Sequence, residues 1–260
     1  MTVGCIVQAR MGSSRLPGKV MMDVEKGKPV LYYVISQLRF CKLIDKLIVA
    51  TTTLAEDDKI VKYCNDLDVD SYRGSVQNVL DRYYQCAKKF SISTIVRIPS
   101  DKPLIDPEIV DSIIDKFRVK SYDYVVNFSP STFPSGTEVE VFSFEALETA
   151  WKNAELPSEK EHVTSYIDNH KEKFKIFNVT LPEDLSRYRW AVDRIEDLTL
   201  VRNIASKIKK RPILMGDIID LFKKEPQLAD INKNVNREEG TLKSLKEDDK
   251  YLKSRKTINH

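Results

Sequence analysis

The chain has 260 residues, of which 42% are hydrophobic, so it is long enough to bury a substantial core in one or two domains. Its net charge of +3 gives no reason to expect a nucleic-acid partner, and no apolar run approaches the roughly 20 residues of a membrane span. The four cysteines lack the spacing of a zinc site or a disulfide framework, and because the N-terminus leads directly into a predicted strand we expect no signal peptide. We therefore expect reduced thiols and a cytoplasmic location.

Strand and helix patterns alternate along the first half of the chain. Apolar runs predict strands over residues 3–7, 46–50, 69–72, 94–98 and 123–127. Helical spacing of apolar residues predicts helices over residues 29–40, 56–65, 76–89 and 107–117. This alternation is typical of β-α-β crossovers, so we expect an α/β fold with a Rossmann-like, mostly parallel sheet and helices on both faces. Ligands of such sheets bind at the carboxyl ends of the strands.

The pattern of apolar residues changes after Phe133, where alternation of polar and apolar residues predicts a strand with one solvent-exposed face. The strands predicted in this second half are 137–142, 174–179 and 188–192. The helices predicted here are 144–153, 159–170, 197–207 and 216–224. Residues 207–260 hold 14 Lys and Arg against 9 Asp and Glu, so we expect a basic extension that is helical to partly disordered.

The loop after the first strand concentrates positive charge. Arg10, Arg15 and Lys19 lie among glycines and small hydroxyl residues, which suits a polyphosphate bound through backbone N–H groups and cations. The loop is not a P-loop, because five residues instead of four separate Gly12 from Gly18 and the magnesium-binding hydroxyl is missing. A basic surface turn is the alternative, but so many suitable residues directly after a first strand favour phosphate binding.

Residues 8–19, Gln-Ala-Arg-Met-Gly-Ser-Ser-Arg-Leu-Pro-Gly-Lys, resemble the signature loop of the cytidylyltransferase family. That family includes CMP-KDO synthetases, CMP-sialic acid synthetases and the spore coat polysaccharide biosynthesis protein F group, which this chain resembles most. The resemblance runs from about residue 3 to about residue 200. It implies a nucleotide-diphospho-sugar transferase type of fold and a Mg²⁺-dependent nucleotidyltransferase that uses CTP.

The resemblance also implies which residues contact the nucleotide. They are Gln8, Ala9, Arg10, Gly12, Ser13, Ser14, Arg15, Lys19, Thr51, Arg73, Gly74, Ser75 and Arg82. Arg10, Arg15 and Lys19, together with Asp101, would be catalytic. Two of these assignments have structural alternatives: Thr51 is a common β-former, and Arg82 suits an ion pair on an exposed helix face equally well.

Asp101 and Asp193 follow predicted strands and are the candidate magnesium ligands. Each has a structural alternative, in a turn before a proline for Asp101 and in a helix cap for Asp193. Both resemble the family's magnesium-binding aspartates, which favours the functional interpretation. This chain departs from the family pattern at Ser100, Lys102 and Ala191, and Lys102 would place a cation beside the metal, where it could hold an anionic substrate or weaken metal binding.

The acceptor site is expected to come from the later part of the chain. The resemblance points to Glu138, Glu140, Glu161, His162 and Thr164, and we add Lys102 as an acceptor contact. A buried, hydrogen-bonded histidine is an equally good interpretation of His162. The acceptor itself, an acidic sugar or a phosphate or phosphonate, cannot be read from these residues.

We therefore expect transfer of CMP from CTP to such an acceptor, with release of pyrophosphate, for a surface glycan or a modified lipid. Residues 1–206 would form the catalytic domain, in which about 130–180 is an insertion that covers the pocket and contributes to a homodimer. One alternative is a glycosyltransferase that binds metal through Asp68 and Asp70, although these start a strand at the end away from ligands. The other is a nucleotide-binding protein without catalysis.

Overall fold

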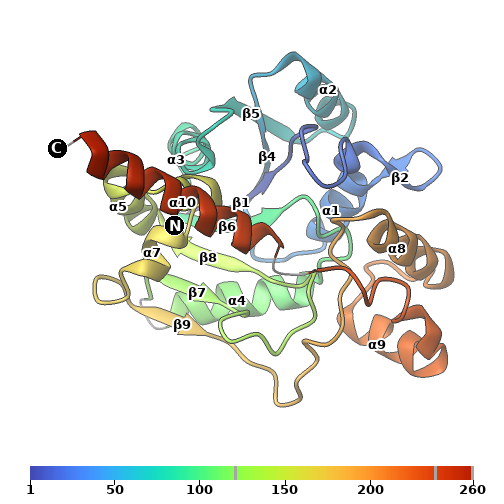
Figure 1. Ribbon diagram of the computed structural model, residues 1–260. Coiled ribbons are helices and arrows are strands. Elements are labelled where there is room, and N and C mark those ends of the chain that lie inside the picture. Colours follow the sequence, from blue (N-terminus) through green and yellow to red (C-terminus); the bar gives the residue numbers. More distant parts are fainter. Residues whose placement is uncertain (120–121, 237–238, 259–260) are drawn as a thin grey trace.

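The structure is a computed structural model that describes residues 1–119, 122–236 and 239–258 (Figure 1). Within these ranges the main sheet has seven strands in the order β5-β4-β1-β6-β8-β7-β9. They are β1 Val3–Gln8, β4 Lys46–Thr52, β5 Asp70–Gly74, β6 Thr94–Pro99, β7 Tyr124–Val126, β8 Glu140–Ser143 and β9 Ile176–Asn178. A small second sheet consists of β2 Asp23–Glu25 and β3 Lys28–Pro29.

Helices connect and follow these strands. The α-helices are α1 Val30–Leu38, α2 Asp58–Asp66, α3 Val79–Lys89, α4 Pro107–Val119, α5 Phe144–Asn153, α6 Pro157–His162, α7 Ser165–Asn169, α8 Ile195–Lys207, α9 Met215–Lys224 and α10 Glu239–Ile258. Three short 3₁₀ helices are η1 Lys19–Met21, η2 Ala55–Asp57 and η3 Pro226–Leu228.

Strand β1 lies inside the sheet between β4 and β6 and runs parallel to both. Its residues Val3, Cys5, Ile6 and Val7 have no exposed surface, as expected for an apolar run in a strand that is covered on both faces. β5 continues the parallel set beside β4, whereas β8 runs antiparallel to β6 and β7. The predicted Rossmann-like, mostly parallel sheet is therefore confirmed, and the carboxyl ends of β1 and β6 meet at one edge.

Two hydrophobic clusters cover the two faces of the sheet. Alternate residues of β1 point to opposite faces, so Val7 joins one cluster and Ile6 the other. The first cluster contains α1, α2 and α4, and the second contains α3, α5 and α7. In Figure 1, α10 crosses in front of the central strands.

A third cluster joins α8 and α9 to the edge of the molecule near α1. Trp190 and Val201 are buried in it, together with Ile213 and Phe222, which come from the stretch beyond residue 206. The first part of the predicted extension therefore packs against the body of the protein. The four cysteines are unpaired thiols.

Two sequence predictions in the second half differ from the structure. The helix predicted over residues 159–170 is two helices, α6 and α7, which are separated at Val163, where φ is +65°. The strand predicted over 188–192 is not a strand, because only an isolated bridge pairs Arg189 with Ser135. The side chains of Trp190 and Val192 in this segment pack in the third hydrophobic cluster, and the segment does not join the main sheet.

Residues 130–180, expected to be an insertion, contribute β8 and β9 to the main sheet as well as α5, α6 and α7. Beyond Glu225, where weak apolar spacing left helix or partial disorder open, α10 forms a helix over Glu239–Ile258. Across the described ranges, no helix combines the length and the apolar character that crossing a membrane requires.

Candidate active site

A cavity of about 880 Å³ lies at the carboxyl ends of β1 and β6. Its walls come from the loop after β1, the start of α3, the end of β6, and the helices α6 and α10. Of the lining residues that the structure describes, seven are cationic and four are carboxylates, so the cavity favours an anionic ligand. The cations are Arg10, Arg15, Lys19, Arg82, Arg97, Lys160 and Lys243, and the carboxylates are Asp101, Glu155, Glu161 and Glu247.

Lys19 brings the two candidate metal ligands together. Its Nζ lies 3.0 Å from Asp193 Oδ1 and 3.3 Å from Asp101 Oδ2, and it donates to the Val192 carbonyl at 2.6 Å. Arg15 also donates to Asp193. Two cations of the loop after β1 and two aspartates from distant parts of the chain therefore meet. Arg15, Lys19 and Asp101 line the cavity, whereas Asp193 contacts Arg15 and Lys19 without lining it.

The carboxylate of Asp193 is held in its ionised form. Burial alone raises its pKa, but the charge of Lys19 and the hydrogen bond from Arg15 outweigh burial and hold the pKa of Asp193 well below its usual range. The other oxygen, Oδ2, accepts a hydrogen bond from Arg189 at 2.6 Å. Asp193 therefore carries a full negative charge at neutral pH.

A second layer of contacts fixes the chain around Asp193. Asp197 has no exposed surface, and its Oδ2 accepts from the backbone N–H of Asp193 at 2.8 Å. Its Oδ1 accepts from Arg189 Nε at 3.2 Å and from Asn232 Nδ2 at 2.7 Å. Sequence reasoning missed Asn232, because an asparagine in a polar stretch gives no signal of the long-range contact that it makes.

The two aspartates fit a magnesium ion, which needs only one or two protein carboxylates because waters and phosphate oxygens complete its coordination. Lys19 already shows that one cation can lie against both carboxylates, Asp101 and Asp193. In the part of the chain that the structure describes, no group of three or more His, Cys, Asp or Glu side chains is arranged to hold a metal. A magnesium ion here would depend on the bound phosphates for its remaining ligands.

The loop after β1 is shaped by its own backbone and by α2. Gly18 has φ of +72°, a conformation that favours glycine, and its N–H donates to the Met11 carbonyl at 2.9 Å. The N–H of Met11 donates in turn to Asp57 Oδ1 at 2.7 Å. Gln8, Ala9, Ser13 and Ser14 line the cavity, whereas Gly12 does not.

Several predicted nucleotide contacts lie elsewhere. Thr51 is fully buried and, like Arg73, Gly74 and Ser75, does not line the cavity. Arg73 instead donates to the carbonyls of Thr52 and Leu54 and pairs with Asp58. The Arg73 side chain therefore links the end of β5 to the end of β4.

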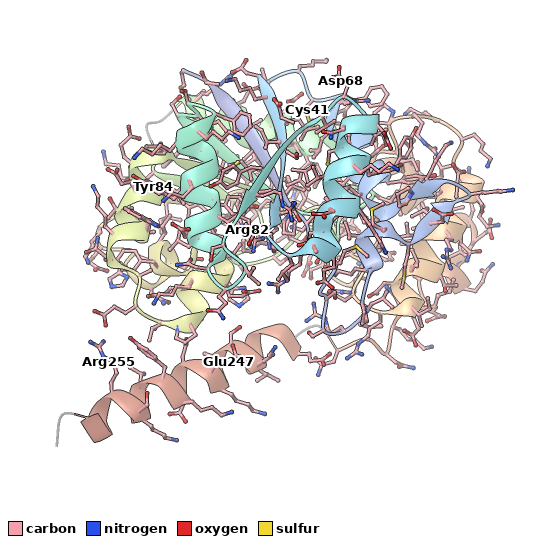
Figure 2. All side chains as sticks on the ribbon, turned by 90° about the horizontal axis from the view of Figure 1, so that it is seen from above. Cys41, Asp68, Arg82, Tyr84, Glu247 and Arg255 are labelled. Carbon is pink, nitrogen blue, oxygen red and sulfur yellow. The ribbon has the colours of Figure 1, made fainter. Side chains whose placement is uncertain are left out.

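Arg82 does line the cavity, but it is not on an exposed helix face (Figure 2). It is 1% exposed, and its Nε and Nη2 donate to the Ser75 carbonyl at 2.9 and 2.7 Å. Burial, helped by the charge of Arg10, lowers the pKa of Arg82. The ion-pair alternative for Arg82 is therefore wrong, and the side chain braces the turn that leads into α3.

Most predicted acceptor residues are buried beside the cavity and do not line it. Lys102 is turned away from Asp101, because its Nζ donates to the Glu138 carbonyl at 2.7 Å and pairs with the Glu138 carboxylate at 3.2 Å. Glu140 pairs with Arg97 and accepts from Thr164 Oγ1 at 2.6 Å. A cation beside the metal ligands, expected from Lys102, is supplied by Lys19 instead.

His162 and Glu161 line the cavity from α6. Glu161 pairs with Arg10 at 2.8 Å, and His162 Nε2 lies 2.6 Å from Ser244 Oγ of α10. Burial, together with the charge of Arg97, lowers the pKa of His162, which favours its neutral form. His162 is half-buried and hydrogen-bonded while it lines the cavity, so these contacts are compatible with both interpretations of this residue.

Sequence reasoning missed two groups of cavity residues. Arg97 lies inside a buried strand, where a single cation in an apolar run gives no sign of facing a ligand. The residues of α10 lie in a polar stretch with weak periodicity, and these are Gly240, Lys243, Ser244, Glu247 and Tyr251. Only the three-dimensional path of the chain brings α10 across the cavity.

Comparisons with known proteins agree with this geometry. A family model described as cytidylyltransferase matches residues 4–239. An uncharacterized protein of Methanocaldococcus jannaschii is 39% identical over 234 residues, which cover 89% of this chain and 95% of the relative. Spore coat polysaccharide biosynthesis protein SpsF of Bacillus subtilis is 29% identical, over 86% of this chain and 95% of its own length.

A solved structure shares both fold and sequence with the chain. It is a cytidylyltransferase from Leptospira borgpetersenii, which superposes with a TM-score of 0.85 at 33% identity and covers 91% of this chain and 98% of the solved one. The positive loop after β1, the paired aspartates and the similarity along almost the whole length agree with one another. The chain belongs to the cytidylyltransferase family.

Proposed function

We propose that this protein transfers CMP from CTP to an acidic sugar, a phosphate or a phosphonate, in the synthesis of a surface glycan or a modified lipid. In this reaction an ionised acceptor oxygen forms a bond to the α-phosphorus. The bond from that phosphorus to the bridging oxygen breaks, and pyrophosphate leaves with the electron pair. Membership of the cytidylyltransferase family supports the reaction type, and the named role of the Bacillus subtilis relative supports a glycan product.

The positive loop carries most of the proposed work. Arg10, Arg15 and Lys19 neutralise the β and γ phosphates, whose charge increases on the leaving group as the bond breaks. Ser13 and Ser14 add hydroxyl and backbone donors from the same loop. Because the loop is fixed by its contacts to α2, these donors need little rearrangement when the nucleotide binds.

Asp101 and Asp193 are the proposed ligands of Mg²⁺. When bound, the ion supplies positive charge at the α-phosphate and orients it for in-line attack. Arg189, which pairs with Asp193, and Asp197, which accepts from the Asp193 N–H, keep that carboxylate directed toward Lys19. The convergence of both aspartates on Lys19, which lines the cavity together with Asp101, is the single observation that carries this proposal.

A glycosyltransferase reaction has less support. Asp70 begins β5 and is exposed at the amino end of that strand, whereas the cavity lies at the carboxyl ends of its neighbours. Asp68 does not line the cavity either. The second aspartate pair therefore lies away from this cavity.

The test is a pyrophosphate-release assay with CTP, UTP, ATP and GTP against acidic acceptors. The panel holds 3-deoxy-manno-octulosonate, a nonulosonic acid, a sugar phosphate and a short phosphonate. We expect release with CTP and at least one acid, and loss of that release when EDTA removes Mg²⁺. No pyrophosphate from any pairing, or release of a nucleoside diphosphate, contradicts the proposal.

Variants connect the reaction to the site. Arg15→Ala and Lys19→Ala are each expected to lower turnover about 100-fold to 1,000-fold, the usual loss for one group that stabilises developing charge. Asp101→Asn and Asp193→Asn are expected to raise the Mg²⁺ concentration that half-maximal turnover requires. Lys26→Ala, in the turn between β2 and β3, is the control and should match the wild type. Wild-type turnover in Lys19→Ala would remove the basis of the proposed mechanism.

A further inference from the structure

We infer that α10 forms one wall of the acceptor subsite and that Lys243 of α10, with Lys160 of α6, binds the acidic group of the acceptor. This inference rests on the proposed function and adds to it the residues that recognise the second substrate.

One face of α10 is directed into the cavity. Its lining residues follow helical spacing along that face: Gly240, Lys243, Ser244, Glu247 and Tyr251. The opposite face presents Leu242 and Leu245, which are 47% and 58% exposed. The helix thus lies across the cavity with its polar face inward, and Figure 2 shows it alongside the body of the molecule.

Contacts with α6 and with the loop after α5 hold α10 in this position. Ser244 Oγ lies 2.6 Å from His162 Nε2, and Asp248 Oδ1 accepts from the Ser158 N–H at 2.9 Å. Further along, Arg255 pairs with Glu155. Three contacts spaced along the helix define which of its faces looks into the cavity.

The N-terminal end of α10 reaches the phosphate-binding loop. Glu239 pairs with Arg194 at 2.7 Å, next to Asp193. A Cβ at Gly240 would lie 3.2 Å from Arg15 Nη1, so the helix backbone passes close to this guanidinium. Residues of α10 are therefore near the phosphate end of the cavity, where the acceptor must approach the α-phosphorus.

The proposed nucleotide contacts leave this wall unassigned. The triphosphate occupies the loop after β1, and the start of α3, with Asn78 and Arg82, remains for the base and ribose. The cavity surface that is left belongs to the end of β6, to Glu155 before α6, and to α6 and α10. An acceptor that is to attack between these parts must rest on that surface.

The charged residues of this wall are Lys160 and Lys243 against Glu155, Glu161 and Glu247. Glu161 is engaged by Arg10 and Glu155 by Arg255, which reduces the repulsion that these two carboxylates exert on an anion. Among the residues that the structure describes, Lys160 has no ion-pair partner, and Lys243 has only a loose one, Glu247, at 3.8 Å. Both ammonium groups are available for an acidic ligand.

The position of α10 in the family comparison agrees with a role in acceptor choice. The family model ends at residue 239, where α10 begins. The proposed nucleotide contacts and α6 lie inside the matched region. The cavity residues of α10, which begin at Gly240, lie outside it. An element beyond the shared region is suited to recognise the substrate that differs between members of a family.

The test measures binding of the two ligands separately. Calorimetry first gives the dissociation constant of α,β-methylene-CTP, a nucleotide that cannot release pyrophosphate. It then gives the dissociation constants of 3-deoxy-manno-octulosonate and of each other acid in the panel, with this nucleotide bound. The variants are Lys160→Ala and Lys243→Ala, and the matched control is Lys246→Ala, an exposed lysine of α10 that does not line the cavity.

We expect both cavity variants to bind the preferred acid about 10-fold to 100-fold more weakly, the usual effect of losing a hydrogen bond to a charged group. Their affinity for the nucleotide, and both affinities of Lys246→Ala, should stay at wild-type values. Wild-type affinity for the acid in both variants overturns this inference and leaves the proposed function standing. Weaker binding of the nucleotide to Lys243→Ala also overturns this inference. If the wild-type protein binds none of the acids, both proposals are overturned.

Discussion

The Arg97–Glu140 ion pair lies inside the main sheet beside the cavity. The two side chains are only 10% and 5% exposed, so water contributes little to either charge. Glu140 also accepts from Tyr124 and Thr164, and Arg97 Nε donates to Gln8 Oε1 at 3.3 Å. Each charge is stable there because the other is present, since an unpaired ion in such surroundings loses its hydration without compensation.

Glu140→Gln is expected to lower the free energy of unfolding by about 3–5 kcal/mol, because it leaves the Arg97 guanidinium buried without a counter-charge. Urea denaturation measures the change. The double variant Arg97→Met/Glu140→Gln should recover part of the loss, since no buried charge remains. Glu183→Gln, in an exposed pair with Arg187, should change stability by less than about 0.5 kcal/mol. An equal cost for both glutamates would contradict the role of burial.

At the scale of single residues, the sequence was most informative in the loop after β1. Arg15 and Lys19 could be predicted to act together because they lie in one short loop. Asp101 and Asp193 were predicted from the resemblance to the family. Which face of a strand a side chain takes was harder to predict. Thr51 and Arg97 both lie in β-strands, yet only Arg97 lines the cavity, because that depends on neighbouring strands and helices.

At the scale of elements, α7 carries an aspartate in an unfavourable position. Burial raises the pKa of Asp168 to about 6, and the negative charge of Glu140 adds to the increase, although Lys171 and Arg97 oppose it. Because the folded protein holds this proton more tightly than the unfolded chain, stability falls as the pH rises from about 4 to about 6. Above that range the charged carboxylate lowers the stability of the folded state.

Asp168→Asn is therefore expected to stabilise the protein at pH 7.5 by about 1–2 kcal/mol, after allowance for solvent screening of a partly exposed group. At pH 4, where Asp168 is protonated in the wild type, the two proteins should be about equally stable. Urea denaturation at both pH values gives the difference. Glu172→Gln, at an exposed position in the turn after α7, is the control and should show no such pH dependence. A constant difference between Asp168→Asn and wild type would rule out this explanation.

The start of α4 shows a helix cap that also joins two elements. Asp106 Oδ1 accepts from the backbone N–H groups of Glu108 at 2.8 Å and Ile109 at 3.4 Å. Its Oδ2 accepts from the Met215 N–H at the start of α9, at 2.7 Å. One carboxylate thus satisfies N–H groups at the beginnings of two helices.

Asp106→Ala is expected to lower the free energy of unfolding by about 2–4 kcal/mol, since it removes the cap of α4 and leaves the buried Met215 contact without an acceptor. Asp106→Asn keeps one acceptor oxygen and should cost about half as much. Denaturant unfolding compares the two variants. If Asp106→Asn costs nothing, the second oxygen has no part in joining α9 to the fold.

Sequence patterns located most elements because apolar spacing is local. The buried strands β1, β4 and β6 and the helix α4 were predicted with small errors at their ends. The hairpin of β2 and β3 was not predicted, since its strands are too short to show alternation. The path of α10 was not predictable, because its inward face meets a polar cavity instead of an apolar core.

At the scale of the whole molecule, the cavity joins segments that are far apart in the chain. Its walls come from the loop after β1, from α3 and β6 in the middle, and from α6 and α10. A ligand that fills this space contacts strand ends of the sheet, the helix α3 and the C-terminal helix α10. Binding should therefore stabilise the fold as a unit and not only the loop that holds the phosphates.

CTP with Mg²⁺ at 100 times its dissociation constant is expected to raise the free energy of unfolding by about 2.7 kcal/mol. For a chain of this size, that corresponds to an increase in Tm of about 5 to 10 °C, which differential scanning fluorimetry can measure. At the same concentration, Lys19→Ala should show a much smaller increase in Tm. This variant lacks the cation that contacts Asp101 and Asp193 and that we expect to bind the phosphates. Lys26→Ala should respond like the wild type.

UTP, ATP and GTP should raise Tm less than CTP, since they share its phosphates but not its base. Equal shifts with all four nucleotides would show that the cavity binds triphosphates without selecting cytosine, and no shift with any of them would exclude this cavity as the nucleotide site.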